Sequence, residues 1–197
     1  KHRYGNDFSD GYIIKDMTGS CGFKIHKVYF DKSGFKEILK HYELDKKNKK
    51  RLSYILQPFI NCDTGFIFKK YCGPIDLRVI VLNTKIIQTY IRIAEKGKFE
   101  CNIHQGGNLF YIPKKTIPKE VLDMSKKIIK KLGAKIDLRH SLYALDFMQS
   151  NDGNVYCIEG NDTPGIIWEH KNEIDEAKSK EQRFSVQEYL LNKYNRK

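Results

Sequence analysis

Three oxygen-bearing side chains stand out in the stretch YALDFMQSNDGNVYCIEGNDTPG, residues 143–165. Asp146 lies in its first apolar run, and Glu159 and Asn161 end the second, after a turn at 150–153. Because strand side chains alternate between faces, Glu159 and Asn161 point to one side, and antiparallel pairing of the two runs brings Asp146 close to that face. Two carboxylates and an amide carbonyl suit Mg²⁺, which completes its octahedron with phosphate oxygens and water. A hairpin with ordinary edge carboxylates explains these residues equally well.

A lysine beside a glycine-containing loop is the second constellation. Lys15 ends the apolar pattern GYIIKDM (11–17), and TGSCG (18–22) follows. A core strand does not favour an ammonium group, whereas a lysine and the free N–H groups of a glycine loop can cradle phosphate. A lysine at a strand end beside an ordinary turn is the alternative, and a short glycine loop alone is a weak signal.

Two arginines and an aspartate occupy neighbouring strand patterns. Asp76 and Arg78 are two residues apart and therefore share one strand face, and Arg92 lies on the following strand. An arginine that faces inward on a sheet needs an anionic partner, which is either a structural carboxylate or a ligand. Asp76 and Arg78 can form a structural pair, which leaves Arg92 in need of an anion.

The segment NIHQGG (102–107) combines an amide, an imidazole and two glycines. Such a loop suits a mobile lid near a reacting group. A solvent-exposed loop without a functional role is the competing interpretation.

Apolar and alternating runs predict the elements that would position these residues. Strands are expected at 11–17, 23–30, 52–60, 74–82, 85–94, 141–149 and 154–161. Helices are expected at 33–44, with Phe35, Ile38 and Leu39 on one face; at 119–134, with apolar Val121, Leu122, Ile128, Ile129 and Leu132; and at about 184–194. The strand at 52–60 is expected to be buried, and 95–113 to be a polar, glycine-rich excursion. Mostly antiparallel strands with flanking helices predict an α+β protein.

The composition favours a folded protein. The chain has 197 residues, 40% of them hydrophobic, with 12 Tyr and 11 Phe, which suffices for a real core. No apolar run approaches the length of a membrane span. Five cysteines without regular spacing fit a reducing compartment, so a cytoplasmic protein is expected. The net charge of +12 favours anionic partners such as nucleotides, nucleic acid, acidic peptides or anionic lipid, although a solvated lysine-rich surface explains it as well.

Taken together and in order, these segments resemble the ATP-grasp superfamily. The matching segments, from about residue 11 to 165, are YIIKDMTGSCG, YILQPFI, IDLRVIV, YIRIAEKGKFECNIHQGG, LYALDF and YCIEGNDTPG. The nearest branch is similar to the ribosomal-protein glutamate ligases, with glutathione synthetase as a more distant relative. The resemblance implies an ATP-grasp fold, in which two α+β lobes hold ATP between antiparallel sheets. The smaller lobe would cover 1–60 and the larger 61–197, and the family's N-terminal domain and its earlier lysine would be absent from this chain.

The resemblance also implies a nucleotide site. Lys15 would bind the α- and β-phosphates, and the loop with Gly19, Ser20 and Gly22 would close over the triphosphate. The adenine hinge would comprise Gln57, Pro58, Phe59 and Ile60; Pro58 departs from the usual Glu or Lys, and Ile60 would then supply the N–H group. Asp63 or Thr64 would contact the ribose, and Asp76 would belong to the cofactor-binding set.

The same resemblance implies a reaction centre. Asp146, Glu159 and Asn161 match the ligands of Mg²⁺ or Mn²⁺. Arg78 and Arg92 match positions near the acyl phosphate and its transition state. Asn102, with the glycines 106–107, matches a small loop over the reaction centre. Where the family has Arg in the NLHRGG form of this loop, the chain has Gln105, and this departure bears on the substrate.

The implied activity is ATP-dependent carboxylate–amine ligation through an acyl phosphate, with release of ADP and phosphate. The partners would be ATP, a carboxylate and an amine, and an acidic peptide would suit the basic surface; no membrane partner is expected, and the oligomeric state is open. One alternative is a catalytically reduced ATP-binding or interaction module. Another is a basic nucleic-acid-binding domain, against which Asp146, Glu159 and Asn161 argue, because a phosphate backbone does not call for such a cluster.

Overall fold

The computed structural model describes residues 11–16, 25–29, 31–48, 54–71, 73–162, 164 and 173–194. The loop predicted at 18–22 lies outside these residues. In chain order the elements are β1 (Tyr12–Asp16), β2 (Ile25–Val28), α1 (Lys32–Lys47), β3 (Tyr54–Pro58), β4 (Ile75–Leu82), β5 (Lys85–Ile93), η1 (Ile103–Gln105), β6 (Asn108–Tyr111), η2 (Lys114–Thr116), α2 (Lys119–Gly133), β7 (Leu142–Gln149), β8 (Val155–Asn161) and α3 (Glu173–Tyr194).

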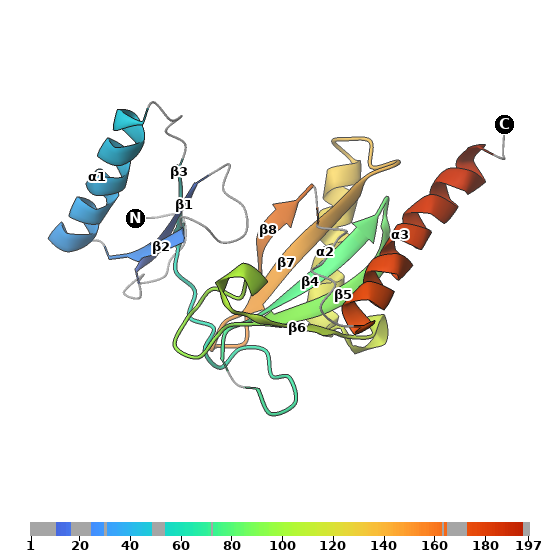
Figure 1. Cartoon of the computed structure of the whole chain (residues 1–197), viewed down its shortest axis with the longest axis horizontal. Coiled ribbons are helices and arrows are strands. Elements are labelled where there is room, and N and C mark those ends of the chain that lie inside the picture. The colour runs from blue at the N-terminus through green and yellow to red at the C-terminus, as the bar shows by residue number, and fades with distance from the viewer. Residues whose placement is uncertain are drawn as a thin grey trace.

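The strands form two antiparallel sheets, which Figure 1 shows side by side. The smaller sheet has the order β2-β1-β3, and the larger has the order β6-β5-β4-β7-β8. The predicted hairpins at 11–30, 74–94 and 141–161 all form, and the pairings of β1 with β3, of β4 with β7 and of β5 with β6 complete the two sheets. The architecture confirms the α+β prediction.

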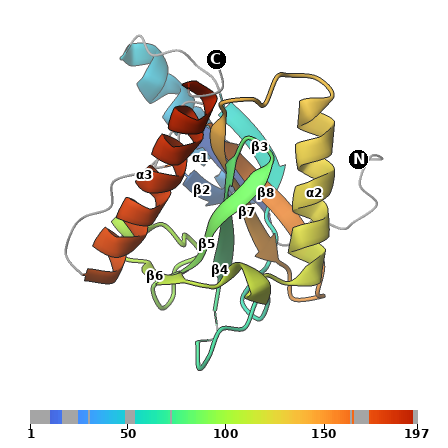
Figure 2. The same cartoon turned by 90° about the vertical axis from the view of Figure 1, so that its right-hand side faces the viewer.

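Two helices flank the larger sheet, with α2 and α3 on opposite sides of it in Figure 2. Beneath α2 lies the main hydrophobic core. The sheet contributes alternate residues of its central strands, and the helix contributes two fully or nearly buried aliphatic side chains; these residues are Leu77, Val79, Leu145, Phe147, Val121 and Ile129. The other face of the same strands is therefore available for polar side chains.

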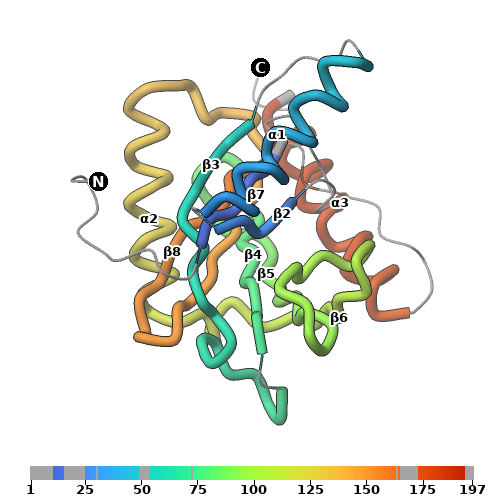
Figure 3. The backbone as a smooth tube through the Cα atoms, turned by 90° about the vertical axis from the view of Figure 1, so that its left-hand side faces the viewer, coloured from blue at the N-terminus to red at the C-terminus, as the bar shows by residue number. Residues whose placement is uncertain are grey.

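The smaller sheet is packed against α1, which lies beside it in Figure 3. Asp31 begins this helix, and its side chain accepts hydrogen bonds from the N–H groups of Ser33 (2.9 Å) and Gly34 (2.8 Å), as an N-cap does. Gly34 packs so closely that a Cβ there would lie 1.9 Å from the Tyr29 carbonyl oxygen. The ring of His41 on α1 stacks on that of His26 on β2, with centroids 4.0 Å apart.

Burial in this smaller part differs from the prediction. The strand at 52–60 was expected to be buried, but in β3 the side chains of Ile55 and Leu56 are 38% and 49% exposed. Among the described strands, β3 pairs with β1 alone and so lies at a sheet edge. On α1, Phe35 and Leu39 share a face as predicted, but both are exposed. Gly34, His41 and Asp45 of α1, which are buried or half-buried, face the smaller sheet instead.

Two further elements depart from the prediction. The polar excursion at 95–113 contains β6, a strand that was not predicted, and it pairs with β5. The last helix begins at Glu173, about three turns before the predicted start. None of the described helices combines the length and the apolar composition of a membrane span.

Candidate functional site

Four charged side chains are buried together on the face of the larger sheet that points away from α2. Arg78, Arg92, Asp76 and Asp146 are each no more than 6% exposed. Two positive and two negative charges leave the cluster formally neutral. Burying charges is unfavourable unless they are paired and hydrogen-bonded, and here all four are.

The strand register explains why these residues meet. Across β5, β4, β7 and β8, one row of directly opposed residues contains Tyr90, Arg78, Asp146 and Glu159. The neighbouring row pairs Arg92 with Asp76. Because directly opposed residues point to the same face, the alternation of the sequence brings them all to one side. The predicted approach of Asp146 to the face of Glu159 is thereby confirmed as geometry.

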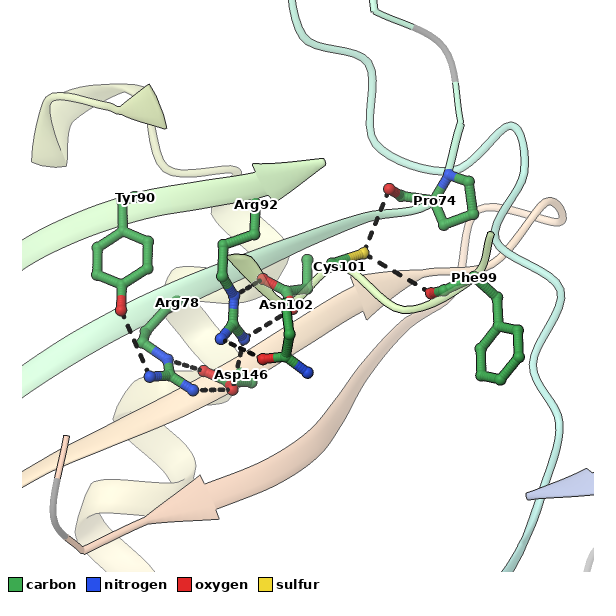
Figure 4. A network of polar contacts seen from close by, with 9 residues as sticks. Pro74, Arg78, Tyr90, Arg92, Phe99, Cys101, Asn102 and Asp146 are labelled. Atoms are coloured by element: carbon green, nitrogen blue, oxygen red, sulfur yellow. Dashed lines mark hydrogen bonds and ion pairs between the residues drawn. The ribbon is translucent and has the colours of Figure 1, made fainter. Parts of the chain in front are cut away.

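Arg92 is held by three residues. It donates two hydrogen bonds to Asp76, from Nε to Oδ1 at 2.8 Å and from Nη2 to Oδ2 at 2.7 Å. Its Nη1 donates to Oδ1 of Asn102 at 3.0 Å, and Nη2 also donates to Oδ2 of Asp146 at 2.9 Å. Figure 4 shows this guanidinium between its partners. The geometry is the bidentate arrangement that fixes an arginine most firmly.

Arg78 has fewer partners. It donates from Nε to Oδ1 of Asp146 at 2.6 Å and from Nη2 to Oδ2 at 2.5 Å. Its Nη1 lies 3.4 Å from the hydroxyl of Tyr90, which is a long contact (Figure 4). Tyr90 was not predicted as a site residue, although its position two before Arg92 already placed both on one face.

The two aspartates differ in acidity. Burial raises the pKa of Asp76 to about 6, against the opposing effect of the charge on Arg92. Burial also acts to raise the pKa of Asp146, but the hydrogen bond from Arg78 and the charges of both arginines outweigh it, so the pKa lies below its usual value. Asp146, which bridges both arginines, is therefore the more strongly ionised of the two.

We expect Asp76 to titrate near pH 6 and Asp146 below pH 3.8. Since the folded pKa of Asp76 exceeds the ordinary 3.8, its contribution to the free energy of unfolding is present below pH 3.8 and is lost as the pH rises through 6. The contribution of Asp146 has the opposite sign: it is present above pH 3.8 and is lost as the pH falls through its folded pKa. NMR titration of the ¹³C-labelled side-chain carboxyls measures both midpoints. Exposed Asp137, whose pKa lies at about 2, is the internal reference, and an Asp76 midpoint below 4 would contradict the prediction.

The segment 94–107 positions Asn102 against Arg92. Lys98 holds it together, because its Nζ lies 2.7 Å from Oε2 of Glu95 and donates to the Gln105 carbonyl at 3.0 Å. Gly107 donates from its N–H to the Asn102 carbonyl at 3.1 Å, and a Cβ on Gly107 would lie 2.3 Å from the Cys101 carbonyl oxygen. The segment therefore turns tightly around Asn102 and requires its glycine.

The oxygen donors for a cation lie at the β8 end of this face. Glu159 is exposed, stands directly opposite Asp146, and makes no side-chain hydrogen bond or ion pair with any described residue. Asn161 follows on the same face, opposite Ala144. The described residues hold no group of three His, Cys, Asp or Glu side chains that could bind a metal. A donor set of two carboxylates and one amide fits Mg²⁺, which keeps several non-protein oxygens.

Asp146 retains acceptor capacity for such a cation. A carboxylate offers about four lone-pair sites. Three are used by Nε and Nη2 of Arg78 and by Nη2 of Arg92. A cation that binds Asp146 therefore shares this carboxylate with the two guanidinium groups.

Apart from Asp76, which lies on β4, the described residues that were predicted to bind the nucleotide lie on and beside the smaller sheet. Lys15 is half-buried at the end of β1, and Gln57 stands opposite Ile13. The N–H of Phe59 donates to the Gly11 carbonyl at 3.0 Å, so it is not available to a ligand, and Ile60 remains the hinge donor to test. Asp63 lies in the exposed turn that follows. Gly19, Ser20 and Gly22 fall outside the described residues.

The segments that follow β3 and β5 contact each other. Phe59 of the predicted hinge meets Phe99 of the segment 94–107 edge to face, with ring centroids 5.8 Å apart. Nζ of Lys27 lies over the Phe59 ring, 3.6 Å from its centroid. The segment that holds Asn102 therefore also contacts the predicted nucleotide hinge.

Curated proteins with similar sequences are ligases by name. The chain is 27% identical over 166 residues to a probable alpha-L-glutamate ligase 2 of Shewanella frigidimarina, which covers 83% of this chain and 50% of that protein. It is 27% identical over 123 residues to a probable alpha-L-glutamate ligase of Coxiella burnetii, which covers 61% of this chain and 38% of the relative. The chain thus spans half or less of the length of these relatives.

Solved structures establish the same fold. D-alanyl-alanine synthetase A from Vibrio cholerae superposes with a TM-score of 0.55 at 15% identity, covering 91% of this chain and 52% of that one. The D-alanine–D-alanine ligase of Bacillus anthracis complexed with ATP gives 0.52 at 17% identity, covering 96% and 56%. The model of the RimK-like ATP-grasp domain matches residues 3–180. The predicted ATP-grasp fold is confirmed, and the chain belongs to the RimK-like ATP-grasp family.

Proposed function

We propose that this chain carries the ATP-binding and ligating site of an ATP-dependent carboxylate–amine ligase. The observation that carries the proposal is the buried cluster of Arg78, Arg92, Asp76 and Asp146, with Glu159, whose carboxylate has no partner among the described residues, directly opposite Asp146. A sheet needs no such cluster for folding, since apolar side chains pack its other face. In an ATP-grasp chain, the phosphates of ATP would be anionic partners of the arginines, and a divalent cation would be the partner of the carboxylates.

The nucleotide would lie between the two sheets. Lys15 and the loop at 18–22 would bind phosphates, and residues 57–60 would bind adenine, with Asp63 or Thr64 near the ribose. This assignment keeps the division into a smaller lobe at 1–60 and a larger one at 61–197. The contact of Phe59 with Phe99 supports it, because that contact joins the hinge to the segment of Asn102.

Asp146, Glu159 and Asn161 would hold Mg²⁺, which supplies charge neutralisation at the phosphates. The sequence analysis placed Asp76 among the cofactor-binding residues, but we propose a different role for it. Both of its oxygens bind Arg92, so we assign it to position that arginine. Asn102 would help to position the same guanidinium, since its Oδ1 accepts a hydrogen bond from Nη1 of Arg92.

The reaction would proceed in two steps, phosphoryl transfer and amide formation. A substrate carboxylate oxygen attacks the γ-phosphorus of ATP, and the bond to the β-phosphate oxygen breaks to give an acyl phosphate and ADP. An amine nitrogen then attacks the acyl carbon, loses a proton and expels inorganic phosphate, which leaves an amide. Arg78 and Arg92 would stabilise the negative charge that develops on the transferred phosphoryl group and on the tetrahedral intermediate.

The names of the relatives make L-glutamate the first substrate to test. Gln105 takes the place of an arginine in the corresponding family loop, which removes one cation from this side of the site. We therefore expect the acid or amine to differ from that of the family's ribosomal-protein ligases.

The test is ADP release by the full-length protein with Mg-ATP and a library of acids and amines that includes L-glutamate and acidic peptides. Hydroxylamine should trap the acyl phosphate as a hydroxamate when the right acid is present. ATP binding without ADP release or hydroxamate for any pair would refute the ligase and favour the non-catalytic ATP-binding module.

A further inference from the structure

The two buried arginines are held by unequal sets of partners. Arg92 keeps two hydrogen bonds to Asp76 and one to Asn102 in addition to its bond to Asp146. Arg78 has Asp146, which it binds through Nε and Nη2, as its single carboxylate partner among the described residues. Its other contacts there are both to the neutral side chain of Tyr90, with Nη1 3.4 Å from the hydroxyl and Cζ 5.9 Å from the ring centroid. A change at Asp146 therefore affects the two guanidinium groups differently.

Asp146 is shared between Arg78 and the donor set for a cation. Three of its acceptor sites are occupied by guanidinium N–H groups, two of them from Arg78. Glu159, directly opposite, has no side-chain partner among the described residues, so binding a cation would break none of their contacts. A divalent cation bound to Glu159 and Asp146 would lie close to the Arg78 guanidinium, because both bind the carboxylate of Asp146. Two positive charges at such a short distance repel each other strongly.

We propose that Arg78 is the exchangeable counter-ion of Asp146, and that Arg92 is the fixed arginine of the site. A divalent cation displaces the Arg78 guanidinium from Asp146, and Arg78 then binds an anionic group, the phosphate or carboxylate of a ligand. Arg92 stays in place because Asp76 and Asn102 hold it independently of Asp146. This inference rests on the proposed function, since it assumes that Asp146 receives the cation.

Metal binding by an Arg78→Gln variant tests the competition directly. Mn²⁺ is the probe, and EPR measures the free ion in titrations of the ligand-free protein. Removing the competing positive charge should tighten Mn²⁺ binding by about tenfold or more. Arg78→Lys, which keeps the charge, should gain less. Arg139→Gln is the matched control, because Arg139 forms an exposed pair with Asp137 at 2.8 Å outside the cluster, and it should bind Mn²⁺ as the wild type does. Unchanged or weaker binding by Arg78→Gln would overturn the proposal.

A second measurement uses the wild-type protein, so that it does not depend on the folding of a variant. In protein labelled with ¹⁵N-arginine, the buried Nε–H groups of Arg78 and Arg92 should give separate NMR signals, assigned through Arg78→Lys and Arg92→Lys. Saturating Mg²⁺ should shift the Arg78 signal and speed its exchange with water, and leave the Arg92 signal protected. Movement of both signals, or of the Arg92 signal alone, would overturn the proposal.

The two measurements separate this inference from the function on which it rests. If Mn²⁺ binds the wild type and Arg78→Gln equally, the metal site stands and only the exchange is wrong. If neither protein binds Mn²⁺ and Mg²⁺ moves no arginine signal, the metal site itself is wrong, and both proposals fail.

Discussion

Replacing Asp146 with Asn is expected to lower the free energy of unfolding by about 3–5 kcal/mol and to abolish Mg²⁺-dependent ATP binding. The stability loss follows from the position of Asp146, which is 1% exposed and accepts hydrogen bonds from both buried arginines. With the carboxylate gone, Arg78 keeps a buried charge without an anionic partner among the described residues, whereas Arg92 keeps Asp76. The unpaired charge, rather than the lost attraction, accounts for most of the effect.

Urea unfolding measures the stability change, and calorimetry of ATP binding with and without Mg²⁺ measures the functional one. Asp137→Asn is the control, since Asp137 pairs with Arg139 on the surface, where both side chains are more than half exposed. That variant should unfold at nearly the wild-type urea concentration. If Asp146→Asn were as stable as the control, the buried cluster would not have the role assigned to it.

The sheet and the shared face of the charged residues could be predicted from the sequence. Alternation in 74–82, 85–94 and 141–161 sets the strands, and tight turns fix the hairpin registers, as at Asn83, whose φ of +59° suits the two-residue turn after β4. Once the register is fixed, spacing by two places Asp76 with Arg78, and Glu159 with Asn161, on one face. These inferences depend on local periodicity, which the sequence shows directly.

The pairing within the cluster could not be predicted. The sequence suggested an Asp76–Arg78 pair on one strand, whereas Asp76 binds Arg92 across the β4–β5 register and Arg78 binds Asp146 across the β4–β7 register. Long arginine side chains reach several neighbours on a face, so spacing alone does not decide between them. Tyr90 was missed for a related reason, because an aromatic residue in an apolar strand first suggests core packing.

The sequence predicted α1 and the second half of α3, but not which side of these helices is buried. The inward side of α3 carries Ser179 and Gln182, each 1% exposed, while Phe184 and Leu191 are 66% and 62% exposed. The first half of this helix was not predicted, since sequence patterns locate a helix by an apolar stripe that faces the core. The outward Phe35 and Leu39 of α1 show the same inversion. Tertiary packing, and not periodicity, decides which face of these helices is buried.

Replacing Glu159 with Gln is expected to reduce ligase turnover by about 100-fold or more and to leave the free energy of unfolding nearly unchanged. Glu159 is exposed and makes no side-chain hydrogen bond or ion pair with the described residues, so folding loses nothing when its charge is removed. The function, however, loses one of the two carboxylates assigned to Mg²⁺. ADP release at saturating Mg-ATP and urea unfolding measure the two effects on the same preparation.

Glu95→Gln is a control of the same chemistry, because Glu95 is an exposed carboxylate whose partner is Lys98 in the segment 94–107. It should reduce turnover far less than Glu159→Gln, since Glu95 lies outside the assigned metal ligands. Equal turnover losses in both variants would contradict the metal assignment.

Asp146 and Glu159 stand opposite each other in one row of the sheet, yet substitution of Asp146 is expected to affect both stability and function, and substitution of Glu159 function alone. That difference follows from burial, since only Asp146 neutralises charges that the folded protein has already removed from water.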